Sequence, residues 1–146
     1  MKALVVYDSV YGNTETIAKA IGGALAGEVR VARVGEIDAA QLERVDVLLI
    51  GSPTLGGRPS EPLQQFLDKL PESAVKDVRI AAFDTRYSGK FVKIFGFASE
   101  KIAAALQAKG GKVAEPLGAF IVKGKKGPLQ DGEVERAVNW AIQVTK

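Results

Sequence analysis

Short apolar runs alternate with amphipathic segments along the whole chain. Five of these runs are candidate strands. The nearly continuous aliphatic runs are typical of strands that are buried on both faces of a sheet, whereas the second alternates Val29 and Val31 with Arg30 and Arg33. The five runs cover residues 3–7, 29–34, 45–50, 78–83 and 113–122. The last run is interrupted at Pro116, Leu117 and Gly118. The pattern therefore predicts five strands, of which the fifth is broken.

Between the runs, apolar residues recur at helical spacing. The four stripes are Ile17, Ala20, Ile21, Ala24 and Leu25; Leu63, Phe66, Leu67 and Leu70; Ala98, Ile102, Ala105 and Leu106; and Val134, Ala137, Val138 and Ala141. Strands that alternate with helices favour an α/β fold, in which a parallel sheet is covered on both faces. The 146 residues suit one domain, 1–146, and contain no linker or repeat.

Cysteine and histidine are absent, which excludes disulfides, thiol nucleophiles, Cys/His zinc sites and histidine bases. We predict no metal site. The net charge of +3 suits an acidic partner but is too small to indicate nucleic-acid binding. No apolar run approaches the roughly 20 residues that span a bilayer, and the amino terminus is typical of a strand rather than a signal peptide. We therefore expect a cytoplasmic protein without membrane insertion.

In open parallel sheets, ligands bind at the carboxyl ends of the strands, so the loops after the first, third and fourth strands are candidates. Residues 8–16 combine hydroxyls, an amide and a glycine where a helix begins, which is typical of an anion site. The hydroxyls of Ser9, Thr14 and Thr16 could contribute, although helix capping explains them equally well. The nucleotide-triphosphate ending Gly-Lys-Ser/Thr and the three-glycine dinucleotide motif are both missing.

The other two loops have features that suit a flat ligand. Residues 51–59 are rich in glycine and proline, and Gly56 and Gly57 allow close backbone approach, although a mere tight connection is an alternative. In residues 84–89, Tyr87 offers a stacking face, although an exposed surface tyrosine is the more common case for a single residue. The basic run 123–128 favours a solvated loop over a docking patch for an acidic partner.

Taken together, the loops resemble those of flavodoxins, both short-chain flavodoxins and the flavodoxin-like module of flavodiiron proteins. The segment VVYDSVYGNTETIAKAI at residues 5–21 and the GSPT segment with its following glycines carry the resemblance. It implies a three-layer, doubly wound sandwich with a five-stranded parallel sheet in the order 2-1-3-4-5. It also implies one noncovalent FMN and no catalytic residue.

The resemblance assigns three groups of residues to the cofactor. They are Ser9, Val10, Tyr11, Gly12, Asn13 and Thr14 for the phosphate end, Pro53, Thr54, Leu55, Gly56 and Gly57 for one side of the ring, and Thr85, Arg86, Tyr87 and Gly89 for the other. Many flavodoxins have a tryptophan in the second loop, where this chain has Leu55 and Arg58. The single tryptophan, Trp140, falls in the last helix and is expected to pack in the core.

The implied function is one-electron transfer between redox proteins by a monomer. The alternative is an FMN-dependent reductase of quinones or other small molecules. A phospho-receiver domain would need an aspartate after the third strand, where Gly51 and Ser52 stand.

The charges expected around the ring predict a less negative potential for the reduced state than in an acidic flavodoxin, because nearby cations favour the reduced anion. They are Arg58, Arg86, Lys90 and Lys93 against Asp8, Glu61 and Asp84.

Overall fold

The computed structural model describes residues 1–87 and 96–146. Its sheet is built from β1 (Lys2–Tyr7), β2 (Glu28–Arg33), β3 (Val47–Pro53), β4 (Arg79–Tyr87), β5 (Lys112–Val113) and β6 (Gly118–Val122). The strands run in the order β2-β1-β3-β4-β5, β6 also pairs with β4, and the pairings are parallel. The predicted fold class and strand order are confirmed.

The fifth strand position is filled by two segments. β5 pairs with the beginning of β4, where Arg79 lies opposite Lys112, and β6 pairs with its end, where Phe83 lies opposite Gly118. The break between them contains Pro116, which has no N–H to donate to a sheet. The break covers residues 114–117, so it begins earlier than predicted and ends before Gly118, which is already part of β6.

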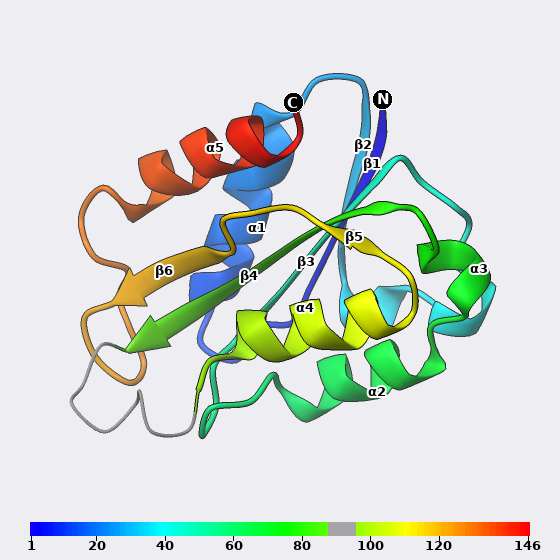
Figure 1. The fold of residues 1–146 in the computed structure, drawn as a ribbon. Coiled ribbons are helices and arrows are strands. Elements are labelled where there is room, and N and C mark those ends of the chain that lie inside the picture. Colours follow the sequence, from blue (N-terminus) through cyan, green and yellow to red (C-terminus); the bar gives the residue numbers. More distant parts are fainter. Residues whose placement is uncertain (88–95) are drawn as a thin grey trace.

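Helices cover both faces of the sheet (Figure 1). α1 (Asn13–Ala24) and α5 (Glu133–Val144) lie on one face, and α2 (Glu61–Lys69) and α4 (Ala98–Ala108) lie on the other. Three short helices, η1 (Val34–Glu36), η2 (Ala39–Gln41) and α3 (Glu72–Val75), complete the connections. The result is the expected three-layer arrangement.

The strands feed two separate hydrophobic clusters, because successive side chains point to opposite faces. In β3, Leu48 and Ile50 belong to the cluster under α2 and α4, whereas Val47 and Leu49 belong to the one under α1 and α5. Every residue of β3 is buried, which explains its nearly continuous apolar sequence. One predicted core position, Val134, is instead 40% exposed.

Trp140 packs within the second cluster, as predicted. Its ring makes edge contacts with Phe83 and Phe120, at centroid distances of 5.9 and 5.8 Å. A Cβ at Gly51 would lie 2.2 Å from the Phe83 ring, so the absence of a side chain there makes room for this aromatic group. The Trp140 Nε1–H donates to the Pro116 carbonyl at 2.8 Å.

β3 and β4 are longer at their carboxyl ends than predicted. Residues 51–53 and 84–87, which the sequence suggested were loops, continue the strands in register, with Pro53 opposite Thr85. The polar side chain of Ser52 can be buried here because its hydroxyl donates to the Pro53 carbonyl (2.9 Å) and accepts from the Ser60 N–H (2.9 Å). The strands therefore carry polar residues to the edge of the sheet.

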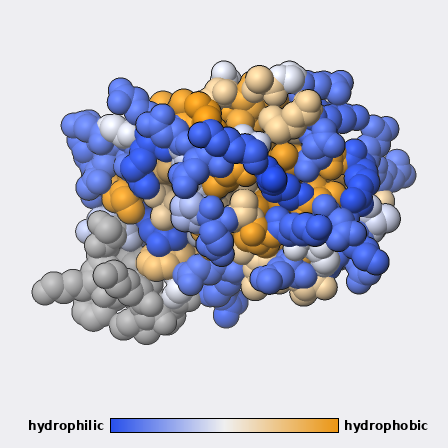
Figure 2. Space-filling model, turned by 45° about the horizontal axis from the view of Figure 1, so that its top comes forward, coloured by the Kyte–Doolittle hydropathy of each residue, from blue (hydrophilic) through white to orange (hydrophobic). Residues whose placement is uncertain are grey.

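The helices present polar outer surfaces. In Figure 2, hydrophilic residues cover much of the visible face, and hydrophobic residues show between them. In α5, for example, Glu135 and Asn139 are exposed, whereas Ala137 and Ala141 are buried. Within residues 1–87 and 96–146, no helix combines the length and apolar character needed to cross a membrane.

Candidate functional site

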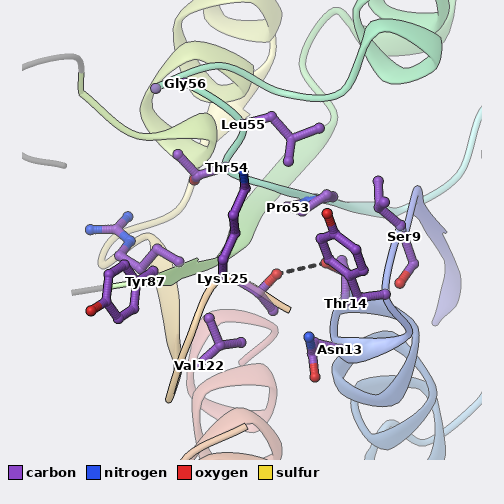
Figure 3. Close-up of a pocket in the computed structure, with 15 residues that line it drawn as sticks. Ser9, Asn13, Thr14, Pro53, Thr54, Leu55, Gly56, Tyr87, Val122 and Lys125 are labelled. Atoms are coloured by element: carbon purple, nitrogen blue, oxygen red, sulfur yellow. Dashed lines mark hydrogen bonds between the residues drawn. The ribbon is translucent and has the colours of Figure 1, made fainter. Parts of the chain in front are cut away.

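A pocket of about 550 Å³ opens where β1, β3 and β4 end (Figure 3). Residues from four segments line it. They are Ser9, Val10, Tyr11, Asn13, Thr14, Pro53, Thr54, Leu55, Gly56, Gly57, Thr85, Arg86, Tyr87, Val122 and Lys125. The fold thus brings the three predicted loops to one place, as expected for the carboxyl edge of a parallel sheet.

Of the predicted cofactor residues that the structure describes, all except Gly12 line this pocket. Gly12 instead shapes the first loop, since its φ of 92° lies in the left-handed region immediately before α1. Gly89 lies outside the described residues, as do Lys90 and Lys93 of the expected rim. Two lining residues were not predicted, Val122 at the end of β6 and Lys125 in the following loop.

The first loop is held together by its own hydroxyls. The Ser9 Oγ accepts hydrogen bonds from the N–H groups of Gly12 (3.1 Å) and Glu15 (3.3 Å), and Thr16 donates to the Gly12 carbonyl (3.0 Å). Ser9 therefore binds one N–H of the first turn of α1, as capping predicts, whereas Thr16 donates to a carbonyl and caps no N–H. No side chain caps α1 from Gly12, however, so the positive end of the helix dipole stays available to an anion.

Thr14 and Thr85 form a buried pair at the pocket wall, with 2.7 Å between their hydroxyl oxygens (Figure 3). Each hydroxyl has one proton, and the bond between them uses only one of the two. The second proton remains for another acceptor. Because both side chains line the pocket, a ligand oxygen there could accept it.

Asp8 stabilises the first loop from a buried position and does not contribute to the charge at the rim of the pocket. It is buried, and its Oδ2 accepts a 2.5 Å hydrogen bond from the Ser60 hydroxyl. Arg33 donates to the Asp8 carboxylate (3.4 Å) and to the Ser9 carbonyl (2.9 Å). These bonds fix where the chain leaves β1.

A second contact anchors the first turn of α1 to β1. The Tyr7 hydroxyl donates to the Glu15 carboxylate at 2.8 Å. Burial, reinforced by this bond, raises the pKa of Tyr7. The same bond, helped by the charge of Lys19, lowers the pKa of Glu15.

The second wall is a tight turn made of backbone. Leu55 and Arg58 exchange N–H to carbonyl bonds of 2.8 and 3.1 Å. Gly56 and Gly57 between them have φ values of 57° and 81°, as in a type I′ turn, which few residues other than glycine adopt. Lys101 of α4 donates to the Gly57 carbonyl at 2.5 Å and so ties the turn to the helix.

The third wall is the end of β4. Arg86 forms two parallel hydrogen bonds of 2.8 Å with the fully buried Asp84, which also accepts from the Ser99 N–H at 2.9 Å. The Arg86 guanidinium lies 3.5 Å from the centre of the Phe97 ring. Arg86 and Asp84 therefore neutralise each other and add no net charge to the rim. Tyr87 follows them and is 47% exposed.

Large exposed hydrophobic side chains gather at this pocket. Val10, Tyr11, Leu55 and Tyr87 are each at least 40% exposed, and all four line it. Exposed apolar surface of this kind usually marks a binding site. A helix N-terminus with spare hydroxyl protons lies beside these apolar walls, so the residues present fit a flat ring that carries an anionic arm, as FMN does.

Comparisons with known proteins agree with this geometry. The fold matches that of a flavodoxin from the domain Archaea, with a TM-score of 0.82 and 24% identity, covering 99% of this chain and 96% of that one. A diflavin flavoprotein of Nostoc sp. is 43% identical over an alignment of 70 positions, gaps included, which covers 43% of this chain and 12% of that protein. An NAD(P)H dehydrogenase (quinone) of Methylocella silvestris is 28% identical over an alignment of 179 positions, gaps included, which covers 93% of this chain and 90% of the relative.

The chain thus spans only a small part of the diflavin flavoprotein it matches. The flavodoxin family model, in contrast, matches residues 5–140, which include all the described residues that line the pocket. The match begins within β1 and ends within α5, so it extends across the whole sheet. The chain therefore belongs to the flavodoxin family, whose members are flavoproteins that bind FMN and take part in electron transport.

Proposed function

We propose that the pocket holds FMN without a covalent link and that the protein carries electrons, one at a time, between two redox proteins. The observation behind this proposal is that one pocket combines a helix N-terminus, whose N-cap residue Gly12 has no side chain, with exposed apolar walls. A ligand with a flat ring and a phosphate arm needs both kinds of surface.

The phosphate end would lie at the first turn of α1. Ser9 is suited to this role, because its oxygen already accepts two N–H bonds and its proton remains to be donated. The pair formed by Thr14 and Thr85 has a further proton to offer. No lysine or arginine lies within residues 8–16, so this loop would bind the anion through neutral donors and the helix dipole.

The ring would lie among the apolar side chains, between the turn at Gly56 and Gly57 and the face of Tyr87. Bound FMN supplies reversible one- and two-electron transfer, and the protein binds and orients it. The exposure of Leu55 (40%) and Tyr87 (47%) supports a ring held close to the surface. A partner protein could then approach the ring without any opening of the fold.

A second candidate, an FMN-dependent quinone reductase, is favoured by the similarity to the quinone dehydrogenase of Methylocella silvestris. Such an enzyme needs space for a substrate beside the flavin. The pocket, at about 550 Å³, lies within the usual range of roughly 300–1,000 Å³ for a single ligand. An acidic partner, a monomeric state, a single domain and a cytoplasmic location stay predictions.

Stepwise anaerobic reduction of the FMN-loaded protein, followed by absorbance, tests the two candidates. Two separable one-electron phases, with slow oxidation of NAD(P)H in the presence of a quinone, are expected for the carrier. A single two-electron phase with rapid NAD(P)H oxidation would instead favour the reductase. Free FMN in the same buffer is the control, and a chain that binds no FMN would contradict both candidates.

A further inference from the structure

The pocket is lined by two cationic side chains and, among the described residues, by no acidic one. The charge of the first, Arg86, is already committed to the buried Asp84 through two 2.8 Å hydrogen bonds. The second, Lys125, makes no hydrogen bond or ion pair within residues 1–87 and 96–146. In Figure 3 its side chain extends into the space that the lining residues enclose. The uncompensated charge at this pocket therefore comes from Lys125.

The loop that carries Lys125 is ordered by backbone hydrogen bonds. Lys123 donates to Pro128 (2.8 Å), Gly127 donates to Gly124 (3.0 Å), and Val122 pairs with Leu129 in an antiparallel bridge. The lysines of this loop are exposed, in keeping with the solvated loop that the sequence favoured, but its backbone is held by these bonds. Because the backbone is fixed, only the side chain of Lys125 would lose freedom on binding a ligand.

The same loop is docked on the amino end of α1. The Asn13 side-chain amide donates to the Lys126 carbonyl at 3.1 Å, and a Cβ at Gly127 would lie 2.6 Å from that amide. The backbone next to Lys125 is therefore anchored at the end of the pocket where neutral donors meet the helix dipole. Lys123 is paired with Asp131 at 3.8 Å, and Lys126 does not line the pocket.

We propose that Lys125 pairs with the phosphate of the bound flavin nucleotide and makes the pocket prefer a phosphorylated flavin to the uncharged riboflavin. This inference rests on the proposed binding of FMN in the pocket. The first loop offers the phosphate hydroxyls and N–H groups but no full positive charge, and Lys125 supplies it from a neighbouring loop. A lysine ammonium on its flexible stem can turn toward an anion while its backbone stays in place.

Binding constants of the flavin-free protein for FMN and for riboflavin, at low and high ionic strength, test the proposal. Lys125→Gln should bind FMN about 10-fold more weakly at low ionic strength, because a charged hydrogen bond is lost. Its affinity for riboflavin should not change, and its FMN affinity should depend less on salt than that of the parent protein. Lys125→Arg should keep most of the preference for FMN.

Lys126→Gln is the matched control, because it removes the same charge from the adjacent position outside the pocket, and it should leave both affinities unchanged. An equal loss of FMN and riboflavin affinity in Lys125→Gln, an equal effect of Lys126→Gln, or no effect at all would overturn the role of Lys125. Failure of the proposed function looks different, because the unaltered protein would then bind neither flavin. Unchanged thermal unfolding of the variants verifies that they fold.

Discussion

Two walls of the same pocket are built on different principles. The loop after β1 uses side chains, with the hydroxyls of Ser9 and Thr14 each holding a defined hydrogen bond. The turn after β3 uses backbone, since Gly56 and Gly57 present almost no side chain and adopt positive φ values. The first wall therefore selects a ligand by where its acceptors lie. The second selects by shape, because it allows a flat surface to come close.

The two walls also differ in how firmly they are held. The loop is tied to β4 through Thr85 and to the 123–128 loop through Asn13. The turn is closed by two backbone hydrogen bonds and tied to α4 by Lys101. Substitutions in the loop should therefore remove specific interactions with the ligand, whereas those in the turn should act through backbone strain.

The largest effect on binding is expected from Thr14→Ala in the loop. This change removes a buried hydroxyl that is bonded to Thr85 and lines the pocket. FMN binding should weaken by about 1–3 kcal/mol, measured by titration of the flavin-free protein. Thr16→Ala is the control, because that hydroxyl bonds only within the loop and does not line the pocket. Equal FMN affinity in Thr14→Ala and the parent protein would count against this wall as the phosphate site.

Gly56→Ala should act on the turn through conformation alone. A Cβ at Gly56 would have no atom within 4 Å, but the φ of 57° is unfavourable for alanine. The free energy of unfolding should fall by about 1–2 kcal/mol. The control is Gly23→Ala, which adds the same methyl group within α1, where a Cβ would also have no atom within 4 Å. Because alanine favours the helix over glycine, this variant should be more stable than the parent protein by about 0.5–1 kcal/mol. Chemical denaturation that gave both variants the same sign would refute the strain argument.

Glu133→Gln tests the comparison of the two walls with a substitution that belongs to neither wall but should lower the stability of the fold. Glu133 accepts from the Ile121 N–H (2.7 Å) and from two nitrogens of Arg136 (2.9 and 2.7 Å), which joins α5 to β6. Loss of its charge should reduce the free energy of unfolding by about 1 kcal/mol, since Arg136 is partly exposed. The affinity of the folded variant for FMN should be unchanged. Weaker FMN binding would show that this junction positions the pocket.

This effect should depend on pH. The hydrogen bonds from Arg136, and then from the Ile121 backbone, lower the pKa of Glu133 against the opposing effect of burial. A carboxylate with a lowered folded-state pKa stabilises the protein fully above the unfolded value of about 4.3. That contribution is lost as the pH falls through the folded pKa. The difference in stability between Glu133→Gln and the parent protein should therefore begin to shrink as the pH falls below about 4.3.

The smallest effect is expected for charge at the turn. Arg58 is exposed beside Gly57, whereas the first loop contains no cation. Arg58→Gln should make the potential for the reduced state more negative by about 10–40 mV, the range for a screened surface charge. Arg30→Gln, an exposed arginine on β2, should leave the redox titration unchanged. A shift of the same size in both variants would point to net charge rather than position.

The aliphatic runs and helical stripes predicted a parallel sheet covered on both faces, because they are local signals. The resemblance of the loops to those of flavodoxins implied the strand order and nearly all of the described pocket. The carboxyl ends of β3 and β4 could not be predicted from such local signals. Ser52 and Asp84 are polar, and only partners far along the chain, such as Ser60 and Ser99, allow them to continue a buried strand. Asp84 and Arg86 form an ion pair with each other, so together they add no net charge to the rim of the pocket.

Lys125 was missed although a signal existed. The 123–128 loop follows the fifth strand, so it must begin at the same edge of the sheet as the other candidate loops. A basic, glycine-rich run looks like solvated surface when it is considered alone. The contact that fixes it, between Asn13 and Lys126, joins residues 113 positions apart and leaves no local pattern.

The single tryptophan of the chain gives the protein a built-in optical reporter. Trp140 is buried against Phe83 and Phe120, and Phe120 lies in β6, which ends at the pocket-lining Val122. A yellow chromophore bound in that pocket would accept excitation energy from the indole, so emission should dim as the site fills and brighten as it empties. Occupancy and unfolding could then be followed in one unlabelled sample, since loss of the packed environment shifts the emission colour rather than only its intensity.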